Sequence, residues 1–188
     1  MKLDRSFYEQ DTITVAQALL GCLLVSDIGG KDERTAGIIV ETEAYRGEND
    51  PGSHAYKGKT KRNQTMYRKA GRAYIYLIYG KHFLFNVVTE NPGTPGAVLV
   101  RALEPVLGIE TMKQRRATPN IFNLTTGPGK LTQALGITIV HNGVDITGDL
   151  IWVEPYTTCE IQSSSRIGVT DNQMLRFFIN QNKFVSNQ

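Results

Sequence analysis

The chain has 188 residues and a formal net charge of +3, with 40% hydrophobic and 21% charged residues, which is ordinary for a globular protein. This length is enough for one domain with a substantial core, so we expect residues 1–188 to form a single domain. No apolar run approaches the ~20 residues that cross a bilayer, and the N-terminus lacks the apolar segment of a secretory signal. These features exclude a membrane-spanning class, and the net charge is too small to indicate a partner.

Histidine and cysteine spacing gives little support to a metal site. His54, His82 and His141 match neither HxxxH nor HExxH, and the two cysteines form no CxxC. Cys22 and Cys159 lie far apart in the chain, which is more typical of a reduced, intracellular protein than of a disulfide scaffold. We therefore expect no bound metal.

In chain order, the predicted elements are mostly strands joined by tight turns. A helix is expected at 11–20, where Asp11 can cap the first turn and Gly21 ends it. Helices are also expected at 105–116 and 127–137, each with a proline at its start. The predicted strands are 22–28, 35–45, 71–80, 81–89, 96–104, 151–155, 165–169 and 175–179. Because neighbouring strands pair in hairpins and precede helices, the expected fold class is α+β, with a curved, mainly antiparallel β-sheet, peripheral helices and a protruding β-hairpin.

Residues 51–89 combine cations with aromatic rings and contain no Asp or Glu. They begin inside a polar segment, 46–62, that is long for a structureless connection, and such segments are often functional. A solvated basic loop beside an aromatic strand pair would explain the pattern, but the interleaving favours a nucleic-acid surface, with cations for phosphates and rings for bases. The cations are Lys57, Lys59, Lys61, Arg62, Arg68, Lys69, Arg72 and Lys81. The rings are Tyr56, Tyr67, Tyr74, Tyr76, Tyr79, Phe83 and Phe85.

The strand expected at 35–45 carries two carboxylates and a phenol on one face. Side chains alternate along a strand, so Glu41, Glu43 and Tyr45 should share a face with Ile39. The pattern is compatible with a solvent-facing edge that bears two harmless glutamates. It is also compatible with a carboxylate held in a pocket for proton transfer, either as one of a glycoside hydrolase pair or as a single glutamate that activates water.

The hairpin expected at 71–89 supplies possible pocket walls and an exposed tip. Tyr74 and Tyr76 point to one face and could be pocket walls or core aromatics with wet hydroxyls. Tyr79 precedes Gly80 and Lys81, a plausible turn, so it should stand near the tip, where its own domain cannot easily cover it. An aromatic side chain at a protruding tip suggests insertion into a base step.

The segment TTGPGKLT, at 125–132, resembles part of a nucleotide-binding P-loop, but Leu124 stands where that motif requires glycine. Nucleotide hydrolysis is therefore not expected. A helix N-terminus with Lys130 could still approach a phosphate, and a plain turn into a helix explains the segment equally well.

Eight segments in chain order together resemble the alkyladenine DNA glycosylase family, also called methylpurine-type 3-methyladenine DNA glycosylases. The segments are VETEAY (40–45), SHAYKG (53–58), RNQTMY (62–67), GRAYIYLIYG (71–80), FNVV (85–88), VRALEP (100–105), GPGKLTQAL (127–135) and RIGV (166–169). The resemblance extends from about residue 6 to residue 179. Because the chain lacks the long N-terminal extension of vertebrate members, it is similar to the compact bacterial type, for which a cytoplasmic location and a monomer are expected.

The resemblance implies a monofunctional DNA repair glycosylase that acts without metal, cofactor or covalent intermediate. Such an enzyme would flip a damaged purine from double-stranded DNA and hydrolyse its N-glycosidic bond with a glutamate-activated water, leaving an abasic site. The implied substrate class is 3-methyladenine, 7-methylguanine, hypoxanthine and ethenoadenine. The alternatives are a non-catalytic nucleic-acid-binding module and a bifunctional lyase that uses a lysine Schiff base.

The resemblance also implies roles for matching positions. Glu43 would deprotonate the water, and Arg101 and the Val169 carbonyl would hold it. Tyr45 and Tyr76 would sandwich the flipped base. The other base-pocket positions are His54 against the base edge, Tyr74 in support of His54, and Asn86 against the exocyclic amine of normal guanine.

At the hairpin, Tyr79 would fill the gap that the flipped nucleotide leaves in the DNA stack. These roles require Tyr76 and Asn86 in one pocket, whereas a two-residue turn at 80–81 would pair Tyr76 with Phe85 and turn Asn86 away. We therefore expect a three-residue loop or a bulge in this hairpin. Phosphate or DNA contacts are expected from Lys57, Lys59, Lys61, Arg62, Lys81 and Lys130.

Overall fold

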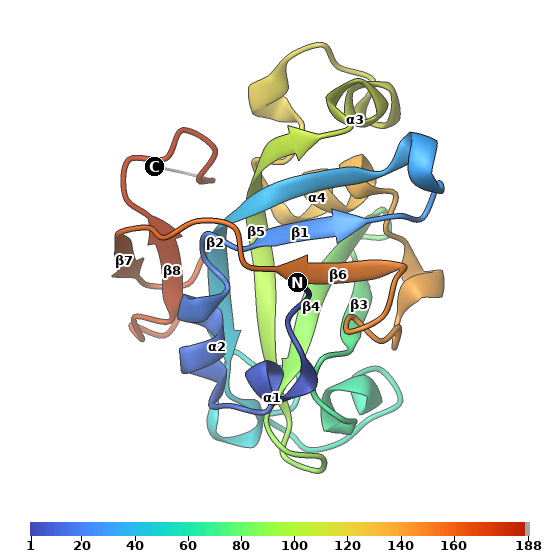
Figure 1. Ribbon diagram of the computed structural model, residues 1–188. Coiled ribbons are helices and arrows are strands. Elements are labelled where there is room, and N and C mark those ends of the chain that lie inside the picture. Colours follow the sequence, from blue (N-terminus) through green and yellow to red (C-terminus); the bar gives the residue numbers. More distant parts are fainter. Residues whose placement is uncertain (187–188) are drawn as a thin grey trace.

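Eight antiparallel strands form one curved sheet in the computed structural model, which describes residues 1–186 (Figure 1). The strands are β1 (Leu23–Ser26), β2 (Thr35–Tyr45), β3 (Ala73–Ile78), β4 (His82–Thr89), β5 (Gly96–Leu107), β6 (Ile151–Glu154), β7 (Ile161–Ser164) and β8 (Arg176–Ile179). Their order is β3-β4-β5-β2-β1-β6, with β8 paired to both β2 and β7. In Figure 1, β1 and β6 run horizontally whereas β4 and β5 run vertically, which shows how strongly the sheet twists.

Short helices surround this sheet. They are α1 (Arg5–Tyr8), α2 (Thr12–Ala18), α3 (Ile109–Arg116) and α4 (Pro128–Leu135), with single turns of 3-10 helix at Lys31–Glu33, Gly47–Asn49, Gln64–Tyr67, Ile121–Asn123 and Ile139–His141. The main hydrophobic core receives Val15 from α2 and Leu131 from α4, together with residues of the strands. The predicted α+β class is therefore confirmed. None of the helices within residues 1–186 is long and apolar enough to cross a membrane.

Local signals place two of the three predicted helices correctly. Asp11 caps α2, because its carboxylate accepts hydrogen bonds from the amides of Ile13 and Thr14 at 2.9 and 3.2 Å. The helix predicted at 127–137 is confirmed as α4, which has Pro128 in its first turn.

One predicted boundary and one predicted strand are wrong. Strand β5 continues through the position of Pro105, so the helix expected at 105–116 begins only at Ile109, after Gly108 has turned the chain with a φ of 72°. Residues 165–169 form a turn rather than the expected strand. Gly168, with a φ of 76°, turns the chain there, and β7 ends before this segment.

Irregular pairing between β2 and β5 breaks the predicted alternation of side chains. The register shifts between Ile39 and Glu41 and again between Glu41 and Thr42. Ile39 therefore packs in the main core together with Ala44 and does not share the face of Glu41, so that prediction is wrong. Glu41 and Glu43 still lie on one face, since both contact Arg101.

The β3–β4 hairpin has the three-residue loop that was expected, at residues 79–81. Tyr74 pairs with Asn86, so Asn86 lies on the same face as Tyr74 and Tyr76. The loop begins with Tyr79 at a φ of 51°, an uncommon backbone conformation for a residue other than glycine. The prediction that the hairpin brings Tyr76 and Asn86 to one side is confirmed.

Candidate active site

Strands β2 to β5 and the segments beside them enclose a pocket of about 630 Å³. This volume lies within the range of ~300–1,000 Å³ that is typical of small-molecule sites. It receives side chains from four strands of the sheet and from two loops, at 46–62 and 166–169. Predicted site residues that line it are Tyr45, His54, Tyr74, Tyr76, Asn86, Arg101 and Val169.

Glu43 lies directly behind this lining and is fully buried. Its Oε1 atom accepts a hydrogen bond of 2.8 Å from the backbone amide of Ile167. Its Oε2 atom accepts a 2.8 Å bond from the Tyr45 hydroxyl and lies 3.4 Å from Nη1 of Arg101. Tyr45, Arg101 and Ile167 all line the pocket, so two hydrogen bonds and one ion pair hold the carboxylate at its wall.

Glu41, the other carboxylate on this face, has a different environment. It is also fully buried, and its Oε1 accepts from Nε of Arg101 at 3.2 Å and from Nε of Arg176 at 2.7 Å. Its Oε2 accepts from the amide of Ser186 at 2.7 Å. Of these partners only Arg101 lines the pocket, so Glu41 anchors β5, β8 and the C-terminal segment. The geometry thus favours one carboxylate at the pocket over a catalytic pair.

The aromatic wall is held together by specific contacts. The Tyr74 hydroxyl and Nδ1 of His54 lie 2.9 Å apart, which fits the expectation that Tyr74 supports His54. The His54 and Tyr76 rings meet edge to face with centroids 4.5 Å apart. Asn86 donates from Nδ2 to the carbonyl of Tyr74 at 3.1 Å, which fixes its amide in the pocket.

Burial sets the protonation of two of these groups. Although part of His54 is exposed, burial of its ring and the nearby Arg62 charge lower its pKa, so the ring is neutral at neutral pH. Burial raises the pKa of Tyr76 to about 12, so its phenol keeps its proton. Uncharged rings of this kind suit stacking against a flat heterocycle.

Tyr79 stands at the mouth of the pocket and is 85% exposed. Leu77, two residues earlier on β3, is also exposed. A loop that holds a tyrosine in left-handed backbone geometry and leaves its ring in solvent gains no packing energy from it. The prediction that Tyr79 is uncovered by its own domain is confirmed.

The predicted phosphate contacts come from three segments, namely the 46–62 loop, the β3–β4 loop and α4. Lys130 lines the pocket mouth, where its Nζ donates to Oγ1 of Thr126 at 3.2 Å. Lys59 lies against the ring of Tyr67, which does not line the pocket, whereas the Arg62 guanidinium lies 5.3 Å from the ring centroid of Tyr76, which does. The exposed cations of the predicted set are Lys57, Lys59, Lys61, Arg62 and Lys81.

Three contributors to the site were not expected from the sequence. The Ile167 amide binds Glu43, and the buried pair of Arg166 and Asp50 lies behind Tyr45. The RIGV segment (166–169) was the sequence feature that could have indicated these contacts. Because it was expected to form a strand, it gave no reason to predict a hydrogen bond from its backbone to Glu43. Within residues 1–186, no three His, Cys, Asp or Glu side chains gather where they could hold a metal ion.

The site thus combines an aromatic pocket, a buried carboxylate and an arginine at its wall, and an exposed tyrosine at its mouth, a combination compatible with an enzyme that binds a flat heterocycle. The family model described as "Methylpurine-DNA glycosylase (MPG)" matches residues 6–183. The chain therefore belongs to the methylpurine-DNA glycosylase family and is a DNA glycosylase of the class that repairs alkylated purines. The expected family resemblance is confirmed.

Full-length relatives agree with this assignment. A protein from Methanoculleus marisnigri named "Putative 3-methyladenine DNA glycosylase" is 49% identical over 195 residues, which cover 99% of each chain. A protein of the same name from Carboxydothermus hydrogenoformans is 46% identical over 192 residues, again covering 99% of each chain. A third, from Chlorobium phaeobacteroides strain BS1, is 44% identical over 194 residues that cover 98% of this chain and 95% of the relative.

Proposed function

We propose that this chain excises 3-methyladenine and related damaged purines from duplex DNA by hydrolysing the N-glycosidic bond. The related substrates are 7-methylguanine, hypoxanthine and ethenoadenine. The observation that carries the proposal is Glu43, a buried carboxylate held by two hydrogen bonds and an ion pair with Arg101 at the wall of a pocket with aromatic sides. A carboxylate held at the wall of the pocket can take a proton from a bound water, whereas base binding alone makes no use of it.

In the proposed reaction, Glu43 takes a proton from a water that Arg101 and the Val169 carbonyl help to hold. The water oxygen bonds to C1′ of the sugar while the C1′–N bond breaks. The electron pair of the C1′–N bond leaves with the purine. A cationic lesion such as 3-methyladenine departs as a neutral base. A neutral lesion such as hypoxanthine needs a proton, and the lowered pKa of His54 suits that ring to hydrogen bonding at the base edge rather than to proton donation.

The binding energy for flipping is proposed to come from the tyrosines. Extrusion costs a few kcal/mol, and less for a damaged or mispaired base, which biases selection toward lesions. Stacking between Tyr45 and Tyr76 returns roughly 1–3 kcal/mol, and Tyr79 fills the vacated space in the duplex. Asn86, fixed by its bond to Tyr74, would exclude the exocyclic amine of normal guanine.

A lyase mechanism is less compatible with the pocket. A Schiff base requires a lysine at the reacting sugar, and within residues 1–186 the lysine that lines the pocket is Lys130, at its mouth and on the α4 side. Borohydride should therefore trap no covalent complex between the enzyme and DNA. Trapping that disappears in Lys130→Ala would instead establish the lyase alternative.

The test is a single-turnover assay with excess enzyme. Duplexes with one 3-methyladenine, 7-methylguanine, hypoxanthine or ethenoadenine are incubated and then treated with alkali, which breaks the strand at abasic sites. We expect breaks with at least one lesion for the wild type and almost none for Glu43→Gln. Tight binding by the wild type without breaks at any lesion would favour a non-catalytic binding module.

A further inference from the structure

We propose that Arg166 is a positioning residue that aligns Tyr45 and Glu43 with each other, an inference that rests on the function proposed above. Its side chain is completely buried. Nη1 and Nη2 form two parallel hydrogen bonds, of 2.6 and 2.7 Å, with the carboxylate of Asp50, and Nη2 also donates to Asp171 at 2.5 Å. This bidentate geometry fixes the plane of the guanidinium, whereas a lysine ammonium would act as a point charge with no defined plane.

The guanidinium covers one face of the Tyr45 ring. Its central carbon lies 4.6 Å from the ring centroid. Tyr45 lines the pocket and Arg166 does not, so the cation supports the ring from the side away from the pocket. The proposed stack therefore has four layers, with Arg166, Tyr45, the flipped base and Tyr76 in sequence. A ring held from behind loses less entropy when a base stacks on its front.

Arg166 also fixes the backbone that joins the two functional side chains. Its Nη1 donates to the carbonyl of Ala44 at 2.9 Å, and Ala44 is the residue between Glu43 and Tyr45. The next residue after Arg166 is Ile167, whose amide donates to Glu43 at 2.8 Å. One buried side chain thus connects the strand that carries both groups to the loop that orients the carboxylate.

A matched arrangement at a distant position provides the control. Arg34 forms a bidentate pair with Asp27 at 3.1 and 2.9 Å, and its guanidinium lies 5.3 Å from the centroid of Trp152. These residues contribute nothing to the pocket lining. Arg34→Lys therefore removes the same kinds of interaction without reaching Tyr45 or Glu43.

The variant to test is Arg166→Lys, which keeps a buried cation beside Asp50 but loses the planar fork. Single-turnover rates and half-saturating enzyme concentrations are measured on the best wild-type lesion, alongside thermal midpoints. We expect Arg166→Lys to slow the saturated rate by about 10²-fold, the cost that a misplacement of about 1 Å can have, while Arg34→Lys keeps the wild-type rate. The rate loss caused by Arg166→Lys should be smaller in a Tyr45→Ala background, because Arg166 is proposed to act partly through the Tyr45 ring, which that background lacks.

Asp171→Asn gives a second, milder variant that retains the Asp50 pair, and it should also slow the saturated rate. If Arg166→Lys does not fold, this variant decides the proposal. Folded Arg166→Lys or Asp171→Asn protein with the saturated rate of Arg34→Lys would overturn the positioning role while the proposed function stands. A wild type that cleaves none of the lesions would instead overturn the proposed function.

Discussion

The hydroxyl of Tyr45 donates a 2.8 Å hydrogen bond to Oε2 of Glu43, two residues earlier on β2. The Tyr45 ring therefore lines the pocket, while its hydroxyl contacts the buried carboxylate of Glu43. Stacking of a base against this ring and orientation of the carboxylate are therefore physically coupled.

Tyr45→Phe should separate these two contributions. The ring remains, so affinity for lesion-containing DNA should stay near the wild-type value. Loss of a hydrogen bond to a charged group, worth about 1.5–3 kcal/mol, should slow the single-turnover rate by about tenfold or more. Tyr67→Phe is the matched control, since its hydroxyl donates to Glu48 at 3.0 Å on the surface. An unchanged rate with weakened affinity would contradict the coupling.

Glu43→Gln should mainly lower the reaction rate, whereas Glu41→Gln should mainly lower the stability of the protein. Glu43→Gln should lower the glycosylase rate by about 10²- to 10⁴-fold, because an amide cannot take the proton of the water. Glu41→Gln should chiefly destabilise the protein, by roughly 3–5 kcal/mol, because it leaves the buried Arg101 and Arg176 without their carboxylate. Denaturant unfolding and single-turnover rates measured on both variants check this. Equal rate losses in two fully folded variants would instead support a carboxylate pair.

Tyr79→Ala should weaken base flipping and leave the fold intact. The side chain is 85% exposed and adds little to packing, so the thermal midpoint should change little. Lesion affinity should fall by roughly 1–3 kcal/mol, the range for one aromatic–base stack. Ethenoadenine fluorescence reports flipping directly. Tyr156→Ala, at another exposed tyrosine, should leave affinity unchanged, and equal losses in both variants would contradict a role at the tip.

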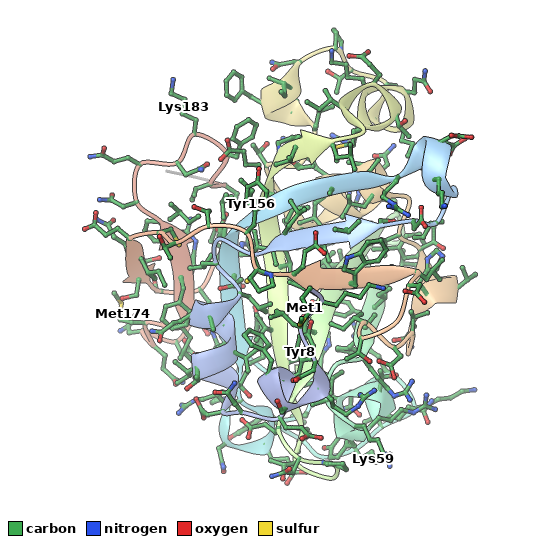
Figure 2. All side chains as sticks on the ribbon, in the orientation of Figure 1. Met1, Tyr8, Lys59, Tyr156, Met174 and Lys183 are labelled. Atoms are coloured by element: carbon green, nitrogen blue, oxygen red, sulfur yellow. The ribbon has the colours of Figure 1, made fainter. Side chains whose placement is uncertain are left out.

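Exposed cations of the 46–62 loop should control the salt dependence of DNA binding. Lys59 and Lys183 project from opposite ends of the molecule in Figure 2. The double variant Lys59→Ala/Lys61→Ala should reduce the slope of log affinity against log salt by about one for each phosphate that the protein no longer neutralises. Lys183→Ala should leave the slope unchanged. Binding isotherms at several salt concentrations provide the measurement, and a slope that changes only in Lys183→Ala would place the DNA elsewhere.

Tyr8 should make the protein sensitive to alkali. Its hydroxyl is buried without a hydrogen-bond partner among residues 1–186, and burial raises its pKa above the ordinary value of 10. The unfolded chain therefore loses this proton at a lower pH than the native chain. The titration of Tyr8 therefore leaves the free energy of unfolding unchanged below pH 10 and lowers it as the pH rises above 10.

Tyr8→Phe should remove this loss and the cost of the unpaired hydroxyl. At neutral pH the variant should be more stable by about 1 kcal/mol, since a buried polar group without a partner costs about 1–3 kcal/mol. Above pH 10 the advantage should grow. Urea unfolding at pH 8 and pH 10.5 measures both effects, with Tyr156→Phe as the exposed control. A variant that unfolds at lower urea than the wild type at both pH values would contradict the prediction.

The sequence by itself was sufficient for the fold class and for most of the strands, and the family resemblance pointed to several residues that line the pocket. Hydrophobic alternation and turn residues are local properties, so they located most of the strands, although β7 was not predicted and residues 165–169 form a turn. The family resemblance implied that Tyr76 and Asn86 face one pocket, which predicted a three-residue loop or a bulge, and the register confirms the three-residue loop. Pairing across one turn needs no knowledge of distant parts of the chain.

Tertiary structure decided which glutamate faces the pocket and what holds it there. Alternation places Glu41 and Glu43 on the same face and cannot tell them apart. Their difference arises from partners far along the chain, since the amide of Ile167 reaches Glu43 whereas Arg176 and the Ser186 amide occupy Glu41. Likewise, the irregular pairing that moves Ile39 into the core depends on β5. Contacts between segments separated by more than a hundred residues form only when the chain folds, so a local pattern carries no record of them.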